Sequence, residues 1–547
     1  MSLLPDLRFY YQQGAKSQYL IYAPDGWDEQ MIKWERNKKY YGMFRSFTIP
    51  LKFVKDGAEA LRRTFYEDGF SSDAQLTVEA LDHESLEYYD AYNGVFDFST
   101  FKDIDTNVEI NLIDAGLVKL IKDKESVEYS FTNWSFEEPD YIGNYPPGVY
   151  KIFWSPDHNV DYYDWFRCMT LENFAKLLID KMVGGQLFDG TYGFDSSLLD
   201  SWKKAIMITN GRAIRYNATC RPPTMELTIY KTSFKDFFKS IDALFCIGFS
   251  VEVRNGVETF VLENRVYHYN ANQIYDVGSV SNLKLAVYKD YNLKSIKAGY
   301  SDKDYDDKNY GWFEFNTEST FEAQNETTGD EYDILPKYRG DGRGIRQIIV
   351  NSDGTAWEND SSDDDIFFVH VENVTETDED HGHAGDMADD KLRKVDDPDT
   401  EYDAYNCEIS PRRNLGRHQG FIDSCMFGLS DKLLEFTSGL KDQSNNETQS
   451  SPIETWVGEY EGWTIGTTAS QVMQWFKPIE ISFEAVYTDD FSASLETNPR
   501  GIVAFKYLGN QYYGYVLSVE TKLTGKGSQS IKLLSIKEND LENLIRS

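Results

Sequence analysis

The stretch that decides the fold is Phe249-Ser-Val-Glu-Val-Arg254, then Asn255-Gly256, then Val257-Glu-Thr-Phe-Val-Leu262. Two runs rich in β-branched and aromatic residues flank Asn-Gly, the dipeptide that best fits a two-residue hairpin turn because both turn positions need a positive φ. The pattern therefore predicts a β-hairpin that turns at Asn255-Gly256.

Both ends of the chain carry further strand signals. Alternation of apolar and polar residues predicts strands at residues 44–53, 74–81, 108–113 and 479–485. Near the C-terminus, residues 502–508 and 511–517 predict a second hairpin across Gly509-Asn510.

Three segments have the helical period instead. Residues 55–69 predict a short helix with Asp56 as its cap and Gly69 as its stop. Two amphipathic helices are predicted at 170–184, with a Thr cap and a Gly stop, and at 233–245.

The predicted fold is α+β and β-rich, with several small β-sandwich-like or barrel-like domains and a few short helices. Aromatic residues make up 15% of the chain, which favours sheets over helical bundles. At 547 residues the chain exceeds one ordinary domain. We expect an N-terminal α+β domain at 1–135, a second α+β domain with two helices and a hairpin at 136–275, a β-rich domain at 276–450 and a C-terminal β domain at 451–547. No tandem repeat at a fixed period is visible.

The third domain contains a strongly acidic loop at residues 353–401. It holds 18 acidic and 3 basic residues, a net charge of −15. Such a run cannot bury enough apolar surface to order itself. We expect a strand at 366–371 to order the middle of this loop. We expect residues 373–399 to add nothing to the core.

The charge balance limits the possible partners. Asp and Glu outnumber Lys and Arg by 91 to 55, a formal charge of −36. A surface that negative repels phosphate backbones and anionic membranes, so we expect no stable nucleic-acid binding and no membrane insertion. No run approaches the ~20 apolar residues of a membrane span. The N-terminal residues lack a signal-peptide pattern, so we expect a soluble protein made in the cytoplasm.

The sequence assigns no catalytic, cofactor-binding or metal site. No phosphate loop, Gly-x-Ser-x-Gly elbow or His-Glu-x-x-His motif is present, so we expect no enzyme activity and no cofactor. The five cysteines are odd in number and contain no Cys-x-x-Cys pair, which favours neither a disulfide scaffold nor a zinc site. Paired carboxylates for glycoside hydrolysis carry little weight among 91 acidic residues, where chance pairs abound.

Three polar clusters are more simply explained as solvated or packed surface than as ligand sites. They are His370 with His381 and His383, Asp157-His158 with Asp161 and Asp164, and the run Asp302-Lys-Asp-Tyr-Asp306. The last resembles the start of a calcium loop, but Asp307 and Phe313 replace the turn Gly and the final Glu. Whether the acidic loop binds calcium stays open.

Several N-terminal segments resemble a known family. The residues Trp34-Glu-Arg-Asn-Lys-Lys-Tyr-Tyr-Gly-Met-Phe44 and Phe53-Val-Lys-Asp-Gly57 look like the opening domain of tail-tip, baseplate-hub and distal-tail proteins from tailed phages and prophages of gut Bacteroidetes. Similar strings are Tyr92-Asn-Gly-Val-Phe-Asp-Phe-Ser-Thr-Phe101, Asp105-Thr-Asn-Val-Glu-Ile110 and Tyr507-Leu-Gly-Asn-Gln-Tyr-Tyr-Gly514. The resemblance is closest over residues 1–130 and carries no catalytic residues with it.

The resemblance implies a structural component of the phage virion that acts at the end of the tail tube. A hub or tail-tip protein would be a trimer that presents pseudo-sixfold symmetry to the tube, closes its end and anchors fibres. Its partners would be itself and the tube, tape-measure and fibre proteins. A distal-tail protein, the alternative, would form a hexameric ring.

Two functions of other classes remain as alternatives. A carbohydrate-binding adhesion protein would also be β-rich and aromatic, but it would need an export signal. A hydrolase domain built into a tail tip would need a compact constellation of His, Cys or Glu, and none is evident.

Overall fold

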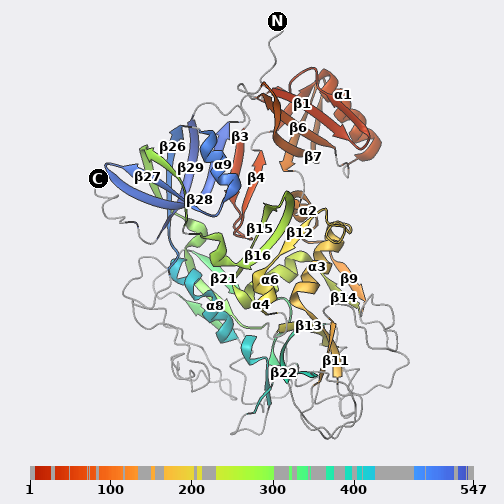
Figure 1. Cartoon of the computed structure of the whole chain (residues 1–547), viewed down its shortest axis with the longest axis vertical. Helices are drawn as coiled ribbons and strands as arrows, with labels where there is room; N and C mark the ends of the chain where they lie inside the picture. Colours follow the sequence, from red (N-terminus) through yellow and green to blue (C-terminus); the bar gives the residue numbers. More distant parts are fainter. Residues whose placement is uncertain are drawn as a thin grey trace.

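In the computed structural model of the chain (Figure 1), only part of the sequence is described. The described residues are 7–25, 27, 31–47, 50–69, 72, 74–81, 86–114, 117–132, 149–153, 165–202, 206–211, 229–270, 272–300, 319–322, 329–342, 345, 365–374, 389–392, 394–396, 403–409, 411–425, 474–486, 488–522, 528–536 and 539.

The described chain has three parts, which are an N-terminal sheet unit, a C-terminal sheet unit and a middle body. In Figure 1 the N-terminal unit is at the top in red, the C-terminal unit contains the blue strands β26 to β29, and the middle body lies below both. Antiparallel sheets dominate, with short helices packed on them, so the predicted β-rich α+β fold is confirmed.

The N-terminal unit is a six-stranded sheet in the order β2-β1-β6-β7-β8-β5, and all neighbours are antiparallel. Its elements are β1 (Leu7–Gln13), β2 (Lys16–Tyr19), β5 (Leu51–Val54), α1 (Lys55–Asp68), β6 (Gln75–Leu81), β7 (Tyr88–Ile104) and β8 (Asn107–Asp114). The helix α1 buries Ala58 and Leu61 in one core with Phe53 and Leu76. The helix therefore covers one face of the sheet.

The start of α1 differs from the prediction. The N-cap residue is Val54, which makes no side-chain cap. Asp56 instead accepts a hydrogen bond at its Oδ2 from the backbone N–H of Ile21 at 2.6 Å, which fixes the loop after β2. The predicted stop is confirmed, since Gly69 follows the helix with a φ of 69°.

The C-terminal unit is an eight-stranded sheet with the path β17-β27-β28-β29-β26-β18, to which β3 and β4 are added through β28. Its elements are β3 (Met31–Arg36), β4 (Met43–Phe47), β17 (Gln273–Ser279), β18 (Ser281–Val287), β26 (Phe476–Val486), α9 (Asp489–Thr497), β27 (Ile502–Tyr507), β28 (Asn510–Lys522) and β29 (Ser528–Ile536). Only Val280 separates β17 from β18, yet these two strands lie at opposite ends of the strand order β17-β27-β28-β29-β26-β18. The sheet must therefore curl round on itself.

Side chains of this sheet alternate between two cores because successive residues of a strand face opposite ways. Val516 and Leu533 face the interior that Phe491 of α9 also fills. Leu517 and Leu534 face the other side, in the core shared with the middle body. Both faces of the C-terminal sheet are thus covered.

The two units repeat one topology. In the N-terminal unit the chain runs β5, α1, β6, β7, β8, and these strands lie in the order β6-β7-β8-β5. In the C-terminal unit it runs β26, α9, β27, β28, β29, and these strands lie in the order β27-β28-β29-β26. Every neighbouring pair in both sets is antiparallel. The repeat has no fixed sequence period, which is why it is invisible in the sequence.

The hairpin of β3 and β4 joins the two units. It lies in the sequence between β2 and β5 of the N-terminal unit, but β3 pairs with β28, with Trp34 opposite Val519. The expected strand at 44–53 is therefore wrong as a single element: β4 belongs to one sheet and β5 to the other. Pro50, which lies between them, cannot donate to a strand ladder. The domain limits proposed from sequence stay predictions.

The middle body combines a closed barrel, β10-β11-β13-β22-β23, with four smaller sheets, β12-β16-β15, β20-β19-β21, β14-β9 and β24-β25. Its strands are β9 (Tyr129–Thr132), β10 (Val149–Phe153), β11 (Trp165–Thr170), β12 (Gly193–Asp195), β13 (Ile206–Asn210), β14 (Ile229–Thr232), β15 (Ile247–Arg254), β16 (Val257–Asn264), β19 (Leu293–Ala298), β20 (Ser319–Glu322), β21 (Asp330–Ile334), β22 (Ile366–Val374), β23 (Asp389–Leu392), β24 (Lys394–Asp396) and β25 (Asp403–Tyr405). Its helices are α2 (Leu117–Lys124), α3 (Leu171–Met182), α4 (Ser197–Ser201), α6 (Phe234–Phe245) and α8 (Pro411–Cys425), with 3-10 turns η3 (Arg265–His268), η4 (Lys289–Tyr291) and η8 (Cys407–Ile409).

Most of the elements predicted for the middle body are confirmed. The two amphipathic helices form as α3 and α6, and Thr170 caps α3 by accepting from the backbone N–H of Asn173. The first hairpin turns at Asn255-Gly256, with φ values of 54° and 80°.

The turn of the second predicted hairpin is displaced by one residue. Tyr507 pairs with Asn510, so the turn is Leu508-Gly509 rather than Gly509-Asn510. The two turn residues have φ values of 49° and 87°, and glycine takes the second position.

The acidic stretch contains more structure than expected. The predicted strand forms as β22, and β23 then pairs with it and with β10 in the closed barrel. Residues 389–392 therefore belong to the barrel, although no strand was predicted between residues 373 and 399. A strand between two partners satisfies its backbone groups on both edges, whatever its charge. The rest of the predicted loop lies largely outside the described residues.

Gly42 marks a close backbone approach between the hairpin β3–β4 and the middle body. Its neighbour Tyr41 forms a parallel bridge with Phe249. A Cβ at position 42 would lie 2.2 Å from the carbonyl oxygen of Phe249. Only glycine fits there without moving one backbone away from the other.

Replacing Gly42 with Ala should therefore lower the free energy of unfolding by about 2–4 kcal/mol, the cost of overpacking a backbone contact. Urea unfolding followed by tryptophan fluorescence would measure it. Lys38→Ala, on the same turn with a side chain 65% exposed, is the control and should cost less than about 1 kcal/mol. Equal, small effects of both changes would contradict the close approach.

Candidate functional site

A buried polar network lies where α6, η3, β21 and α8 meet. Arg265 is fully buried and donates from Nη2 to both carboxylate oxygens of Asp242, at 2.6 and 2.8 Å. Its Nη1 donates to the hydroxyl of Tyr332 at 2.6 Å. His418 Nδ1 lies 2.6 Å from the same hydroxyl, and its Nε2 lies 2.9 Å from the carbonyl oxygen of Asp242. The simplest proton arrangement has Tyr332 donating to Nδ1 and Nε2–H donating to the carbonyl.

Burial and charge set the protonation states in this network. Burial raises the pKa of the Asp242 carboxyl, and the charge and hydrogen bonds of Arg265 oppose that rise. Burial alone would lower the pKa of Arg265, but the Asp242 carboxylate acts together with Cys246, Tyr332 and Tyr41 to hold that pKa well above its ordinary value. Burial also holds the pKa of His418 well below its usual range, so this ring is neutral. The network is therefore an ion pair buttressed by a neutral histidine.

A second buried arginine, Arg36, ties β3 to the rest of the protein. It donates to three backbone carbonyl oxygens, those of Val516 at 3.1 Å, Tyr41 at 2.9 Å and His268 at 2.8 Å. These acceptors belong to β28, the β3–β4 turn and η3. Burial, followed by the charge of Arg36, lowers the pKa of His268 to about 3. This histidine is also neutral.

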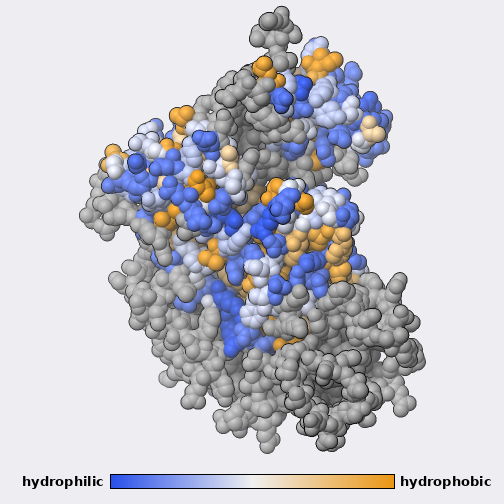
Figure 2. Space-filling model, viewed as in Figure 1, coloured by the Kyte–Doolittle hydropathy of each residue, from blue (hydrophilic) through white to orange (hydrophobic). Residues whose placement is uncertain are grey.

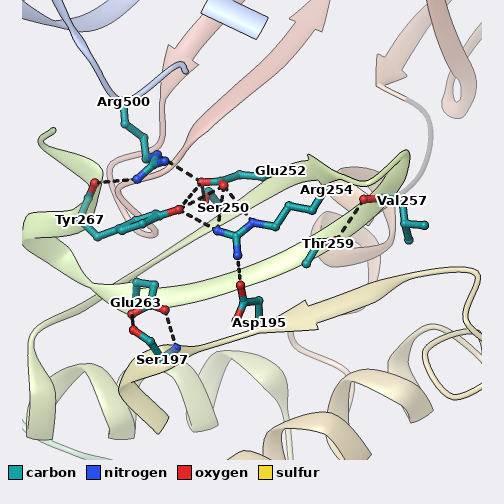
Figure 3. Close-up of polar contacts among 10 residues, drawn as sticks. All are labelled: Asp195, Ser197, Ser250, Glu252, Arg254, Val257, Thr259, Glu263, Tyr267 and Arg500. Carbon is teal, nitrogen blue, oxygen red and sulfur yellow. Dashed lines mark hydrogen bonds and ion pairs between the residues drawn. The ribbon is translucent and has the colours of Figure 1, made fainter. Parts of the chain in front are cut away.

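A partly exposed network lies at the junction of the middle body and the C-terminal unit (Figure 3). Glu252 on β15 accepts hydrogen bonds from Tyr267 at 3.2 Å and from Arg254 at 3.1 Å. Arg500, which precedes β27, pairs with Glu252 at 3.4 Å, and its guanidinium lies 3.7 Å from the ring centroid of Tyr267. Arg254 also pairs with Asp195.

The charges of this junction are matched. Glu252 is surrounded by two arginines, a tyrosine hydroxyl and the hydroxyl of Ser250. A carboxylate so occupied joins segments rather than acting as a general base, because its lone pairs are already committed. Nearby, Glu263 accepts from the backbone N–H and the hydroxyl of Ser197, at 2.6 and 2.9 Å, and so holds the start of α4 (Figure 3).

The described part of the face in Figure 2 is largely polar. Figure 2 shows hydrophilic residues over much of the described part of this face, with hydrophobic residues in small separate groups. Thirteen large hydrophobic side chains of the described residues are exposed, among them Ile21, Leu86, Phe188, Val486 and Leu508.

The clusters weighed in the sequence are mostly outside the described residues. That applies to His381 and His383, to Asp157-His158 with Asp161 and Asp164, and to the run from Asp302 to Phe313. His370 is described: it is buried on β22, and its backbone N–H donates to Asn406 Oδ1 at 2.7 Å. Within the described ranges, no group of three or more His, Cys, Asp or Glu side chains is placed to hold a metal ion. No helix in the described part of the chain is long and apolar enough to cross a membrane.

Sequence reasoning missed the buried arginines. Arg36 falls in Trp34-Glu-Arg36, and Arg265 in Glu263-Asn-Arg265, and neither local pattern marks a buried position. The sequence also did not single out Glu252, which was predicted only as part of the first strand of the hairpin. The available signal for Glu252 and Arg254 is their i, i+2 spacing, which puts both on one face of β15.

Comparisons with known proteins give structural matches alone. No protein-family model and no curated protein sequence matches the chain. Among solved structures, the prophage tail protein gp18 from Listeria monocytogenes EGD-e is 8% identical with a TM-score of 0.32, over 98% of this chain and 97% of that one. The tail protein from Neisseria meningitidis MC58 is 6% identical with a TM-score of 0.35, over 98% of both chains.

A third structure is of the same kind. The 43 kDa tail protein of prophage MuSo2 from Shewanella oneidensis is 7% identical with a TM-score of 0.34, over 97% of this chain and 98% of that one. The chain is similar to phage tail proteins. None of these three comes from a Bacteroidetes host, so that part of the sequence resemblance gains no support. Because the identities and scores are low, we base the assignment of function on the topology of the chain itself.

The buried histidine His418 should make stability depend on mildly acid pH. Its folded pKa lies below its unfolded value, so the unfolded chain binds a proton first as the pH falls. The stability that the neutral His418 ring contributes is fully present above about pH 6.5. As the pH falls below that value, the free energy of unfolding decreases by up to ~1.4 kcal/mol per pH unit. His418→Gln can keep both hydrogen bonds without titrating. Between about pH 7 and 5.5, urea unfolding should show a shallower loss of stability for this variant than for the wild type. Parallel pH profiles would contradict a neutral, buried His418.

The ion pair between Arg500 and Glu252 should couple the C-terminal unit to the middle body. Both side chains are mostly buried, at 18% and 14% exposure. In a double-mutant cycle with Arg500→Ala and Glu252→Gln, we expect a coupling free energy of about 1 kcal/mol from urea unfolding. Lys284→Ala on β18, paired with Glu252→Gln, is the control and should show no coupling. A value indistinguishable from this control would show that the two residues act independently.

Proposed function

We propose that the chain is a structural subunit of a phage tail, namely the baseplate-hub or tail-tip protein that closes the end of the tail tube and anchors fibres. In this role it assembles as a trimer and belongs to the virion. Its neighbours are the tube, tape-measure and fibre proteins.

The observation that carries this proposal is the internal repeat of β-strand, α-helix and three β-strands. One chain holds two such units, the first from β5 to β8 and the second from β26 to β29. Three chains around an axis then present six similar units. A trimer of this kind matches a sixfold tube without needing six copies of the chain.

The repeat favours the hub over the hexameric distal-tail ring. Six chains would present twelve units, twice as many as a sixfold tube can engage in equivalent ways. Closed symmetry requires each contact to be repeated on every subunit. In a trimer, the number of units equals the number of equivalent sites on a sixfold tube.

The charge of the chain suits a position on the path of DNA. With a formal charge of −36, the protein repels a phosphate backbone rather than retaining it. A tube end that bound DNA would slow its passage. Repulsion also accords with the expectation of no stable nucleic-acid complex.

The role is mechanical rather than enzymatic. The polar groups resolved at the junction are paired with one another, and the buried histidines His268 and His418 lie within packed cores. Catalysis needs a nucleophile or base that can reach a substrate. The chain instead places its ordered polar groups where they join one part of the protein to another.

The purified full-length chain should form a closed trimer, alone or with its tube protein. Multi-angle light scattering should give three times the monomer mass, and class averages from electron microscopy should show six similar peripheral lobes. A trimer is expected because three chains with two units each present six units around one axis.

Two outcomes would contradict the proposal. A hexamer with twelve lobes would favour the distal-tail ring. A chain that stays monomeric even with the tube protein would argue against a tail-end role altogether. Incubation with peptidoglycan or capsular polysaccharide tests the mechanical role separately, since reproducible release of fragments would identify a hydrolase.

A further inference from the structure

The face of the N-terminal sheet that lies away from α1 carries three tyrosines. Phe9 and Tyr11 of β1 lie in the core that α1 covers, so Tyr10 between them faces the other way. Tyr10 pairs with Tyr19 of β2, and directly paired residues share a face. Because β6 pairs with both β1 and β7, the same rule places Tyr88 of β7 on this face. We call Tyr10, Tyr19 and Tyr88 the tyrosine platform.

One ion pair holds the tyrosine platform in place. Arg8 Nη2 lies 2.6 Å from Glu79 Oε2. The guanidinium carbon of Arg8 lies 4.9 Å from the ring centroid of Tyr19 and 3.5 Å from that of Tyr88. The Tyr19 hydroxyl donates to Glu79 Oε1 at 3.1 Å, and its ring centroid lies 5.0 Å from that of Tyr10. Tyr19 is 50% exposed, yet contacts with Arg8, Glu79 and Tyr10 fix its ring.

The side chains around the tyrosine platform form hydrogen bonds but carry no charge. Five side chains of this kind share the face, namely Gln12, Ser17, Gln75, Thr77 and Asn93. Amide and hydroxyl groups both donate and accept hydrogen bonds. Among the side chains that the structure describes on this part of the face, Arg8 and Glu79 are charged and neutralise each other.

The helix on the opposite side of the same unit has a different surface. The exposed residues of α1 are mainly charged, and they include Lys55, Glu59, Arg63, Glu67 and Asp68. Charged side chains of this kind are typical of a surface that meets only water. The chain as a whole has a formal charge of −36 and repels anions. A face without net charge on such a protein therefore favours an uncharged partner.

We propose that the tyrosine platform binds a neutral polysaccharide. A pyranose ring has an apolar face of C–H groups and a rim of hydroxyl groups. The rings of Tyr10 and Tyr19 receive the apolar face, while the neighbouring amides and hydroxyls exchange hydrogen bonds with the rim. The Tyr19 hydroxyl donates to Glu79, so its oxygen still accepts a hydrogen bond from the sugar. Because Tyr19 is already fixed, its ring loses little entropy on binding.

The open shape of the face favours a polymer over a single sugar. Pockets for small molecules enclose most of the ligand surface, which one face of a sheet does not do. An extended chain compensates by contacting several strands at once, because each further contact is then intramolecular. The tyrosine platform spans β2, β1 and β7 in this way. The inference goes beyond the proposed function, and its test does not require a trimer.

Affinity electrophoresis of the purified full-length chain tests the proposal. Native gels are cast with dextran, mannan or hydroxyethylcellulose, which are neutral polysaccharides, and with alginate, which is anionic. The wild type should be retarded by at least one of the three neutral polymers and not by alginate.

Variants of the tyrosine platform then locate the binding site. Tyr19→Ala should weaken binding at least about tenfold, and Tyr10→Ala or Tyr88→Ala at least about threefold. Tyr19→Phe keeps the ring and should stay within about threefold of the wild type. Tyr66→Ala is the matched control, because Tyr66 is 72% exposed on α1, and it should bind as the wild type does.

Thermal unfolding checks that the variants fold. Tyr19 lies on an exposed edge strand, so Tyr19→Ala should lower the melting temperature by less than about 4 °C. Tyr19→Phe tests the same ring position without removing the packing of the ring.

Four outcomes would overturn the proposal. The first is a wild type that none of the three neutral polymers retards. The second is equal binding by the wild type and Tyr19→Ala, and the third is equal loss of binding in Tyr19→Ala and Tyr66→Ala. The fourth is a change of oligomeric state in Tyr19→Ala, measured by light scattering, with retardation unchanged, since the face would then meet a second copy of the chain. The first three leave the proposed tail-end function standing, because that function is judged from the trimer.

Discussion

The buried ion pair between Arg265 and Asp242 is the constraint on which the middle of the protein depends. A guanidinium taken out of water is tolerated only with an opposite charge and full hydrogen bonding, because loss of either partner leaves an unpaired buried charge. Asp242 supplies the charge, and Tyr332 and the carbonyl oxygen of Ile247 accept the remaining hydrogen bonds. The ring of Tyr41 lies 3.7 Å above the guanidinium. One side chain thereby fixes α6, β15, β21 and the β3–β4 turn relative to one another.

The same region holds the two ends of the chain together. Arg36 and the bridge between Tyr41 and Phe249 hold the β3–β4 hairpin on the middle body, while β3 extends the C-terminal sheet through β28. Glu252 and Arg500 join that sheet to β15 from the other side. These contacts fix the C-terminal unit on the middle body.

The two units share strand order and helix position, although they share no sequence period. Under the proposed function, three chains would present six such units to a sixfold partner, so that every contact could be repeated around the axis. The buried Arg36 and the ion pair between Glu252 and Arg500 hold the C-terminal unit of each chain in place.

The sequence by itself determined the local elements. The hairpin at Asn255-Gly256, the cap at Thr170 and the stop at Gly69 follow from residues close in the chain, because turns and caps are set by nearby backbone needs. Only the tertiary structure decided the pairing of Trp34 with Val519, the repeat of the two units and the burial of Arg265. Each of these depends on partners far apart in sequence. A charged residue carries no local mark of the partner that will neutralise it, and two units can share strand order without sharing residues.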